Sequence, residues 1–155
     1  MKDLGKTKLC LGLQIEHLAD GVFIHQTAYT QKVLKRFYMD KVYPLSTTMV
    51  VRSLDVSKDP FRPMEEDEEI LVPEVPYLSA IGALMYLINA TRPDIAFSVN
   101  LEARYSSFPM RRHWNGVKHI MRYLKGTIDM GLFYTDKASL VLIGYADAGY
   151  LSDPH

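Results

Sequence analysis

Apolar residues recur at helical spacing throughout residues 77–127, and this pattern predicts three consecutive helices. One face of the first helix consists of Leu78, Ile81, Leu84, Met85, Leu87 and Ile88. The segment Thr91–Asp94 predicts a helix boundary, because a threonine followed three residues later by an acid is typical of a capping box. Short breaks between helices favour antiparallel neighbours, so we expect a three-helix unit.

The next two predicted helices each carry apolar residues on one side. In the second helix these residues are Ile95, Val99 and Ala103, and the helix ends before Pro109. The third helix covers roughly residues 111–125. Its apolar face consists of Trp114, Val117, Met121 and Leu124. Gly126 follows, and a glycine at this point is typical of a left-handed residue that ends a helix.

The beginning of the chain predicts a β-hairpin followed by a helix. Two apolar segments, residues 9–15 and 22–24, flank a turn, and we expect Gly21 to supply the positive φ that this turn needs. Thr27 is predicted to be the N-cap residue of a helix that continues to Tyr38.

Residues 40–76 predict a linker. Five prolines are spread through this segment, and proline both fixes φ and lacks a backbone donor. Residues 65–69 form an unbroken acidic run, whose like charges repel one another. We therefore expect this Pro-rich, acidic linker to be extended and mobile.

The end of the chain predicts two more strands. They cover residues 130–135 and 140–146, with a tight turn at residues 136–137. The run at residues 140–143 is apolar on both faces, which is typical of a strand buried in a larger sheet. Because only a few residues follow, we expect a C-terminal hairpin that begins an incomplete sheet.

Together these patterns predict an α+β fold in four segments. The segments are a hairpin plus helix at residues 1–39, the linker at 40–76, the helical unit at 77–127 and the C-terminal hairpin at 128–155. A chain of 155 residues with 48% hydrophobic and 23% charged residues is long enough for one ordinary globular domain or for pieces of two.

The charges are segregated along the chain. The formal net charge is zero, so no field of the whole protein favours nucleic acid. Between Glu102 and Asp129, however, the chain contains six lysines and arginines and no acid. This acid-free window includes the whole of the third predicted helix.

The cysteine count and the hydropathy of the chain give expectations for its location in the cell. Cys10 is the only cysteine, which excludes an intrachain disulfide and a cysteine-liganded zinc site. The first residues lack the apolar core of a signal peptide, and no stretch approaches the ~20 apolar residues of a membrane span. We expect an intracellular protein, cytoplasmic or nuclear, that is not secreted and has no membrane partner.

Five blocks of the sequence resemble, in the same order, the C-terminal part of the reverse transcriptase of copia-type LTR retrotransposons. The blocks are LGLQIEHLADGVFIHQTAYTQKVLKRF, PLSTTM, YLSAIGALMYLINATRPDIAFSVNLEARYSSFP, HWNGVKHIMRYLKGT and LIGYADAGYLSDP. The resemblance covers nearly the whole chain. It implies a region that follows the polymerase palm, passes through a thumb-like connecting part and enters the ribonuclease H domain.

The same resemblance bears on catalysis. The family's catalytic Tyr-x-Asp-Asp block is missing, and no Asp-Asp pair occurs in the chain. Asp147 corresponds to the first metal-binding aspartate of the family's ribonuclease H site, whose other three carboxylates would lie beyond His155. Two-metal chemistry needs several carboxylates. We therefore expect no complete metal site, no cofactor and no catalytic activity in this chain alone, and Mg²⁺ only in the intact parent enzyme.

The third predicted helix is the candidate binding surface. Its cations are Arg111, Arg112, Lys118, Arg122 and Lys125. They could follow the phosphates of an RNA–DNA or DNA duplex, each contributing affinity that is independent of sequence and sensitive to salt. An ordinary solvated face, with a basic last turn that complements the helix dipole, would give the same pattern. The sequence leaves both interpretations open.

Three functions are compatible with these features. The first is a fragment of a reverse transcriptase and ribonuclease H polyprotein, whose partners would be the missing palm and ribonuclease H segments. The second is a nucleic-acid-binding module retained by the host, which would use the helix at residues 111–125. The third is a secreted effector, because Arg122–Lys125 resembles the Arg-x-Leu-Arg motif of oomycete effectors. The missing signal peptide and the position inside a predicted helix count against this third function.

Overall fold

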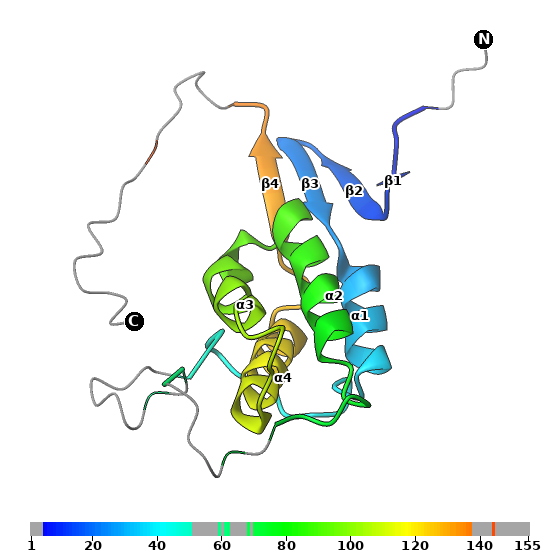
Figure 1. Ribbon diagram of the computed structural model, residues 1–155. Helices are drawn as coiled ribbons and strands as arrows, with labels where there is room; N and C mark the ends of the chain where they lie inside the picture. Colours follow the sequence, from blue (N-terminus) through cyan, green and yellow to red (C-terminus); the bar gives the residue numbers. More distant parts are fainter. Residues whose placement is uncertain are drawn as a thin grey trace.

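A four-stranded antiparallel sheet lies at one end of a group of α-helices (Figure 1). The computed structural model describes residues 5–50, 59, 61–62, 68, 70–137 and 144. Its elements are β1 (Leu9–Cys10), β2 (Leu13–Leu18), β3 (Gly21–His25), α1 (Thr27–Arg36), α2 (Tyr77–Ala90), the 3₁₀ helix η2 (Pro93–Ile95), α3 (Ala96–Ala103), α4 (Arg111–Gly126) and β4 (Gly131–Thr135). The predicted α+β class is confirmed.

The predicted N-terminal hairpin is present as β2 and β3, which pair from Leu18↔Gly21 to Gln14↔His25. The expected positive φ at Gly21 is wrong, since the positive-φ glycines of the described residues are Gly5 and Gly12. A β-carbon on Gly21 would instead collide with the backbone carbonyl of Tyr134. The glycine therefore permits close approach of a neighbouring strand rather than a turn.

A second tight turn divides the segment that was predicted as one strand over residues 9–15. Leu11 and Gly12 have φ values of 49° and 83°, and Cys10 pairs with Leu13 across them. Two successive positive φ values are typical of a type I′ hairpin turn, which sends β1 back along β2. The Tyr86 hydroxyl donates a 2.6 Å hydrogen bond to the Leu11 carbonyl and holds this turn against α2.

The strand expected near residues 130–135 is present as β4, and its observed partner is β3. The two strands pair antiparallel from His25↔Gly131 to Gly21↔Thr135, which gives the sheet order β1-β2-β3-β4. The partner expected from the sequence, residues 140–146, lies outside the described residues apart from Gly144. Among the described residues, β4 thus completes the N-terminal sheet.

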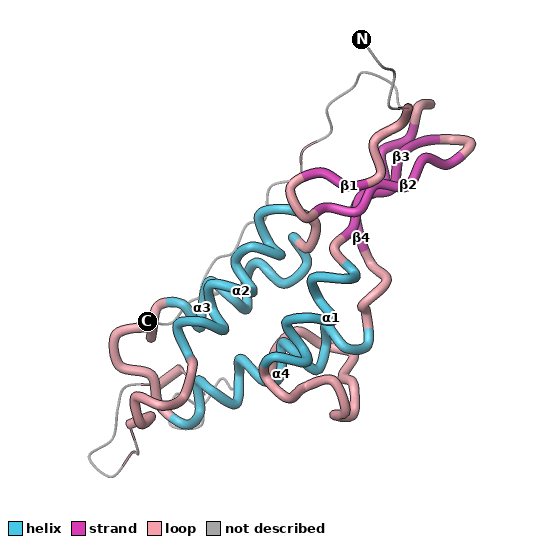
Figure 2. Tube along the Cα trace, turned by 90° about the vertical axis from the view of Figure 1, so that its right-hand side faces the viewer, coloured by secondary structure: helices cyan, strands magenta, loops and turns pink. Residues whose placement is uncertain are grey.

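The core lies between α1, α2, α3 and α4, which Figure 2 shows on one side of the sheet. Its fully buried members on the three later helices are Ala80, Leu84, Leu87, Val99, Val117, Met121 and Leu124. Helix α1 adds Val33 and Leu34 to the same core. Leu78 was predicted on the buried face and is 65% exposed, because the buried stripe of α2 begins at Tyr77. Tyr77 has a larger side chain than Leu78, and its ring packs against the ring of Trp114.

The residues that cap the helices differ from those predicted. Thr27 is the first residue of α1, and Gln26 takes the N-cap position. The capping box expected at Thr91–Asp94 does not form, because the Thr91 hydroxyl donates to Gln26 Oε1 at 2.9 Å instead. At the end of α4, Gly126 is still helical and Thr127 is the C-cap, so the expected left-handed cap is also wrong.

Several described residues of the predicted linker contact the helical part of the fold. Asp59 and Phe61 are buried, and the Tyr105 hydroxyl donates to the Phe61 carbonyl at 3.1 Å. At the start of the segment, the Leu45 N–H donates to the Arg122 carbonyl at 3.2 Å. At these positions the segment contacts the helices instead of extending away from them, while its mobility stays a prediction. Most of the acidic run lies outside the described residues.

Candidate nucleic-acid interface

Helix α4 positions the five predicted cations because its apolar stripe fixes its rotation. Val117, Ile120, Met121 and Leu124 are buried, so the basic residues turn toward the molecular surface. Arg111 is exposed, and the other four cations are half-buried. Aligned carbonyl dipoles make the end of a helix electronegative, and Lys125 in the last turn complements that end.

Arg112 is held by an acid from the predicted linker. Its Nη1 lies 2.5 Å from Glu68 Oε1, and its Nη2 donates to the Arg62 carbonyl at 2.6 Å. Arg62 also pairs with Glu68 at 2.9 Å. Glu68 is shared by two arginines and so offsets only part of the Arg112 charge. The sequence did not indicate this contact, because Glu68 is distant along the chain.

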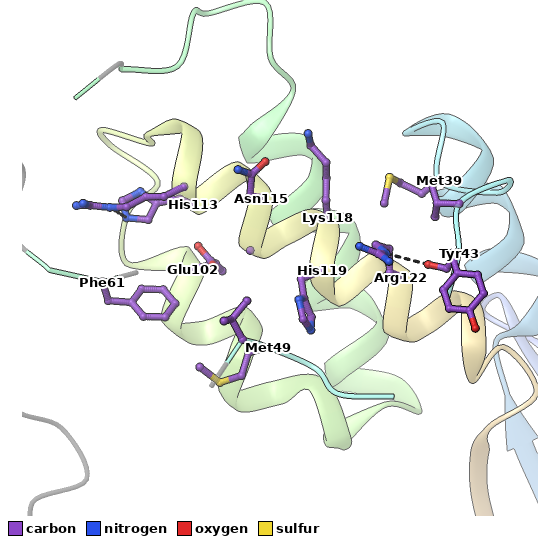
Figure 3. A pocket seen from close by; sticks show the side chains of 14 residues that line it. Met39, Tyr43, Met49, Phe61, Glu102, His113, Asn115, Lys118, His119 and Arg122 are labelled. Atoms are coloured by element: carbon purple, nitrogen blue, oxygen red, sulfur yellow. Dashed lines mark hydrogen bonds between the residues drawn. The ribbon is translucent and has the colours of Figure 1, made fainter. Parts of the chain in front are cut away.

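Arg122 holds in place the segment from Tyr43 to Leu45, which crosses α4. Its Nε donates to the Tyr43 carbonyl at 2.8 Å, the bond drawn in Figure 3, while its own carbonyl accepts from Leu45. The segment from Tyr43 to Leu45 is thereby held along the helix. Lys118, one turn earlier, has its Nζ 5.8 Å from the centre of the Trp114 ring.

A cavity of about 670 Å³ lies beside this part of α4 (Figure 3). Its apolar lining includes Met39, Val42 and Met49, and its polar lining includes Lys118, His119 and Arg122. His119 Nε2 lies 3.1 Å from the Thr47 carbonyl. Burial lowers the pKa of His119, so this ring is neutral near pH 7 and the positive charge at the cavity comes from the lysine and arginines.

Glu102 lines the same cavity, and it is buried in a neutral form. Its side chain is 3% exposed, and burial raises its pKa to about 8. The Tyr77 hydroxyl donates to the Glu102 backbone carbonyl at 2.8 Å and lies 3.3 Å from Oε2. A protonated Glu102 places no negative charge beside the cations of α4 at neutral pH.

His113 is a structural residue at the start of α4. Its ring stacks on Tyr105 with the ring centres 3.9 Å apart, and its Nδ1 accepts the Met110 N–H at 3.2 Å. Burial, aided by the neighbouring Arg112, lowers the pKa of His113 to about 4. The imidazole is therefore neutral at pH 7 and does not add to the positive face.

A buried arginine, Arg92, holds the C-terminal end of α4 in place. Arg92 is 2% exposed and contacts Asp94 through Nε–Oδ1 and Nη2–Oδ2 hydrogen bonds of 2.9 and 2.7 Å. The same guanidinium donates to the carbonyl and the hydroxyl of Thr127, which follows α4. A hydrogen bond from the Tyr123 hydroxyl to Asp94 closes the cluster. The sequence reasoning missed this role of Arg92, although the charged pair beside Pro93 was a visible signal.

Sequence relatives of the chain include plant retrotransposon polyproteins. The Retrovirus-related Pol polyprotein from transposon TNT 1-94 of Nicotiana tabacum is 38% identical over 155 residues, which make up 99% of this chain. The corresponding polyprotein from transposon RE2 of Arabidopsis thaliana is 32% identical over 92% of this chain. This chain is homologous to the Pol polyproteins of copia-type retrotransposons.

This Pol homologue spans only part of its curated relatives: 11% of the TNT 1-94 polyprotein and 9% of the RE2 polyprotein. A third relative, the Secreted RxLR effector protein 161 of Plasmopara viticola, is 44% identical over 79 residues, or 51% of this chain and 56% of that protein. No family model matches the chain. No solved structure matches it either.

The effector-like tetrapeptide of this Pol homologue lies inside α4. Leu124 is fully buried and Arg122 is bonded to the Tyr43 carbonyl. Presentation of this motif to a receptor would require the last turns of α4 to unwind.

The predicted nuclease residue Asp147 lies outside the described residues. Within the described part of this Pol homologue, no three His, Cys, Asp or Glu side chains gather as a metal site would require. The Mg²⁺ of the parent enzyme therefore stays an expectation from the sequence resemblance. In the same part of the chain, no helix combines the length and apolar character needed to cross a membrane.

Proposed function

We propose that this chain is the C-terminal segment of a copia-type reverse transcriptase leading into ribonuclease H, and that it holds the template–primer duplex without catalysing a reaction. The observation that carries the proposal is α4, a 16-residue helix with five lysines and arginines and no acid. The neutral Glu102 strengthens this positive character, because the nearest buried carboxyl does not oppose it.

The dimensions of α4 suit a duplex backbone. Residues 111 and 125 are about 21 Å apart along the axis at a rise of about 1.5 Å per residue. One nucleic-acid strand presents a phosphate about every 3.4 Å of duplex axis, so the helix can lie beside several phosphates. Contacts of this kind position a duplex without reading its sequence, which is the property that a polymerase substrate requires.

We propose that the chain is not catalytic because metal-dependent phosphoryl transfer needs several carboxylates that it lacks. Residues 1–155 contain no Asp-Asp pair, and Asp147 alone corresponds to a nuclease ligand. The purified chain, incubated with Mg²⁺ and a labelled RNA–DNA hybrid, should neither extend the primer nor shorten the RNA. Either product, appearing in proportion to the chain after removal of contaminating nucleases, would contradict the proposal.

Binding is tested by fluorescence anisotropy with a blunt RNA–DNA hybrid. Lys118→Gln combined with Lys125→Gln should weaken binding at least about tenfold in moderate salt, because two phosphate contacts are lost. These lysines are preferred to Arg112 and Arg122, whose guanidinium groups also hold the fold.

The matched control is Lys6→Gln combined with Lys8→Gln, which removes the same charge near β1, at the other end of the molecule from α4 (Figure 1). This pair should change binding little. Equal losses in the two double variants would show that net charge, and not the face of α4, determines affinity.

A further inference from the structure

Tyr38 has a backbone conformation that favours glycine. Its φ is 59°, immediately after α1 and its C-cap residue Phe37. The Tyr38 N–H donates to the Lys35 carbonyl at 3.2 Å, and the Met39 N–H donates to the Leu34 carbonyl at 2.8 Å. These two bonds form a Schellman motif, in which the left-handed position is commonly occupied by glycine because a β-carbon is crowded there.

The strain at Tyr38 is not offset by packing of its ring. The residue is 88% exposed, so the side chain contributes little apolar burial to the fold. Five positions later, Tyr43 is 80% exposed. A strained residue that presents a large side chain to solvent suggests a contact made outside the chain.

Tyr43 is presented by a fixed backbone. Arg122 donates to its carbonyl, and the next bond along the chain joins Leu45 to the Arg122 carbonyl. Figure 3 shows the Tyr43 carbonyl bonded to Arg122 at the edge of the cavity, with the Tyr43 ring on the other side of that carbonyl. An exposed ring on a backbone that is held in place loses little conformational freedom when a planar ligand stacks on it.

The segment that carries both tyrosines is rich in positive charge. Residues 32–43 contain four lysines and arginines and one acid, Asp40. Lys41 is exposed between the two tyrosines, and Lys35 is exposed one turn before Tyr38. Exposed aromatic rings among cations are the chemistry of single-stranded nucleic-acid surfaces, where bases stack and phosphates are neutralised. The faces of paired bases inside a duplex are already stacked and cannot reach such rings.

We propose that Tyr38 and Tyr43, together with Lys41 and Arg122, form a stacking platform for the unpaired bases of a single-stranded extension. The platform rests on the proposed function, because the cations of α4 would hold the duplex from which that extension leaves. A protein partner with an acidic surface is the competing occupant, and stacking favours the nucleic acid.

The test compares a blunt RNA–DNA hybrid with the same hybrid carrying a short single-stranded extension. The unchanged chain should bind the extended hybrid more tightly. Tyr38→Gly and Tyr43→Ser should each weaken binding of the extended hybrid by about five- to hundredfold and leave binding of the blunt hybrid unchanged. Tyr134→Ser, which removes a 56% exposed tyrosine from β4, is the matched control and should change neither.

Tyr38→Gly also separates binding from folding. Glycine fits the left-handed position, so this variant should melt at a higher temperature than the unchanged chain while binding the extension more weakly. Loss of binding in a more stable protein cannot result from unfolding.

Each remaining outcome distinguishes the two proposals. Equal affinity of the unchanged chain for both hybrids, or no loss in either tyrosine variant, would overturn the platform and leave duplex binding by α4 intact. Binding of a free single strand but not of the blunt hybrid would support the platform and overturn the proposed function. Binding of neither nucleic acid would overturn both proposals.

Discussion

Glu102 and Gly116 pack against each other where α3 meets α4, and the carboxyl group of Glu102 occupies the space in which a β-carbon at position 116 would lie. A glycine inside a helix is less favourable than alanine by about 1 kcal/mol. Gly116 stands in the middle of α4, so its presence there needs a reason. The reason is the buried carboxyl, which Tyr77 holds in place from α2.

Gly116→Ala should therefore destabilise the protein despite the better helix propensity of alanine. The new methyl group must displace a buried side chain, and overpacking of this kind costs about 1–3 kcal/mol. Gly82→Ala is the matched control, because Gly82 lies inside α2 and no atom lies within 4 Å of the place that a β-carbon there would take. Urea unfolding should show a loss for the first variant and a gain of up to about 1 kcal/mol for the second.

A background of Glu102→Ala sharpens this experiment. With the carboxyl group removed, Gly116→Ala should no longer destabilise the protein, since the methyl group then has space. A loss of the same size in both backgrounds would show that the contact with Glu102 is not what keeps glycine at this position.

Glu102 also makes stability depend on pH. Its ordinary pKa is 4.5 and its folded pKa is about 8, so between these values the folded protein binds a proton that the unfolded chain has released. The free energy of unfolding should therefore fall as the pH rises from about 4.5 to about 8, and level off above. Glu102→Gln cannot ionise and should be more stable than the unchanged chain at pH 8, with a flatter profile over this range. Identical profiles would contradict a buried, neutral Glu102.

Arg92 should be one of the most sensitive positions in the chain. Arg92→Met removes the partner of the Asp94 carboxylate. Breaking a fully buried ion pair in this way costs about 3–5 kcal/mol, and the loss here should lie below that range because the Asp94 side chain is 31% exposed. Burial would raise the pKa of Asp94, but its hydrogen bonds to Arg92 hold that pKa below its ordinary value. The stability that this pair contributes should therefore be lost as the pH falls through the folded pKa of Asp94.

The control for Arg92→Met is a double-mutant cycle with Asp94→Asn. Arg92→Met combined with Asp94→Asn should recover part of the loss, since no unpaired carboxylate remains. Arg92→Lys should be intermediate, because lysine keeps the charge but cannot make the two-pronged contact. Additive losses in the double variant would contradict coupling between the two side chains.

The helices could be predicted from the sequence because their information is local. Periodicity placed Ile95, Val99, Met121 and Leu124 correctly on buried faces. At Leu78 the predicted buried face is shifted by one residue. Tyr77 is buried instead because its ring packs against Trp114 and its hydroxyl bonds to Glu102, contacts that the sequence pattern does not reveal. The turn at Leu11 was missed because leucine rarely adopts positive φ, so that Gly12 was the one signal for it and lay inside an apolar run.

The long-range pairings could not be predicted in the same way. Nothing in the alternation of residues 131–135 indicates that the partner of β4 is β3, because a strand's pattern reports which face is buried and not which edge is paired. The sequence likewise did not indicate that Arg112 pairs with Glu68, because this pairing depends on how the predicted linker folds back against α4. Of the candidate cations, Lys118 and Lys125 are thus better tests of a surface than the arginines.

The most direct test of the account is the salt dependence of binding to a blunt RNA–DNA hybrid. For the unchanged chain, the logarithm of the association constant should fall linearly with the logarithm of salt concentration, as counterions released by phosphate contacts require. In Lys118→Gln/Lys125→Gln the slope should shrink by about one unit for each lysine, while Lys6→Gln/Lys8→Gln should keep the slope of the unchanged chain. A slope that α4 variants leave unchanged, or binding that salt does not weaken, would contradict the assignment of α4 as the surface that holds the duplex.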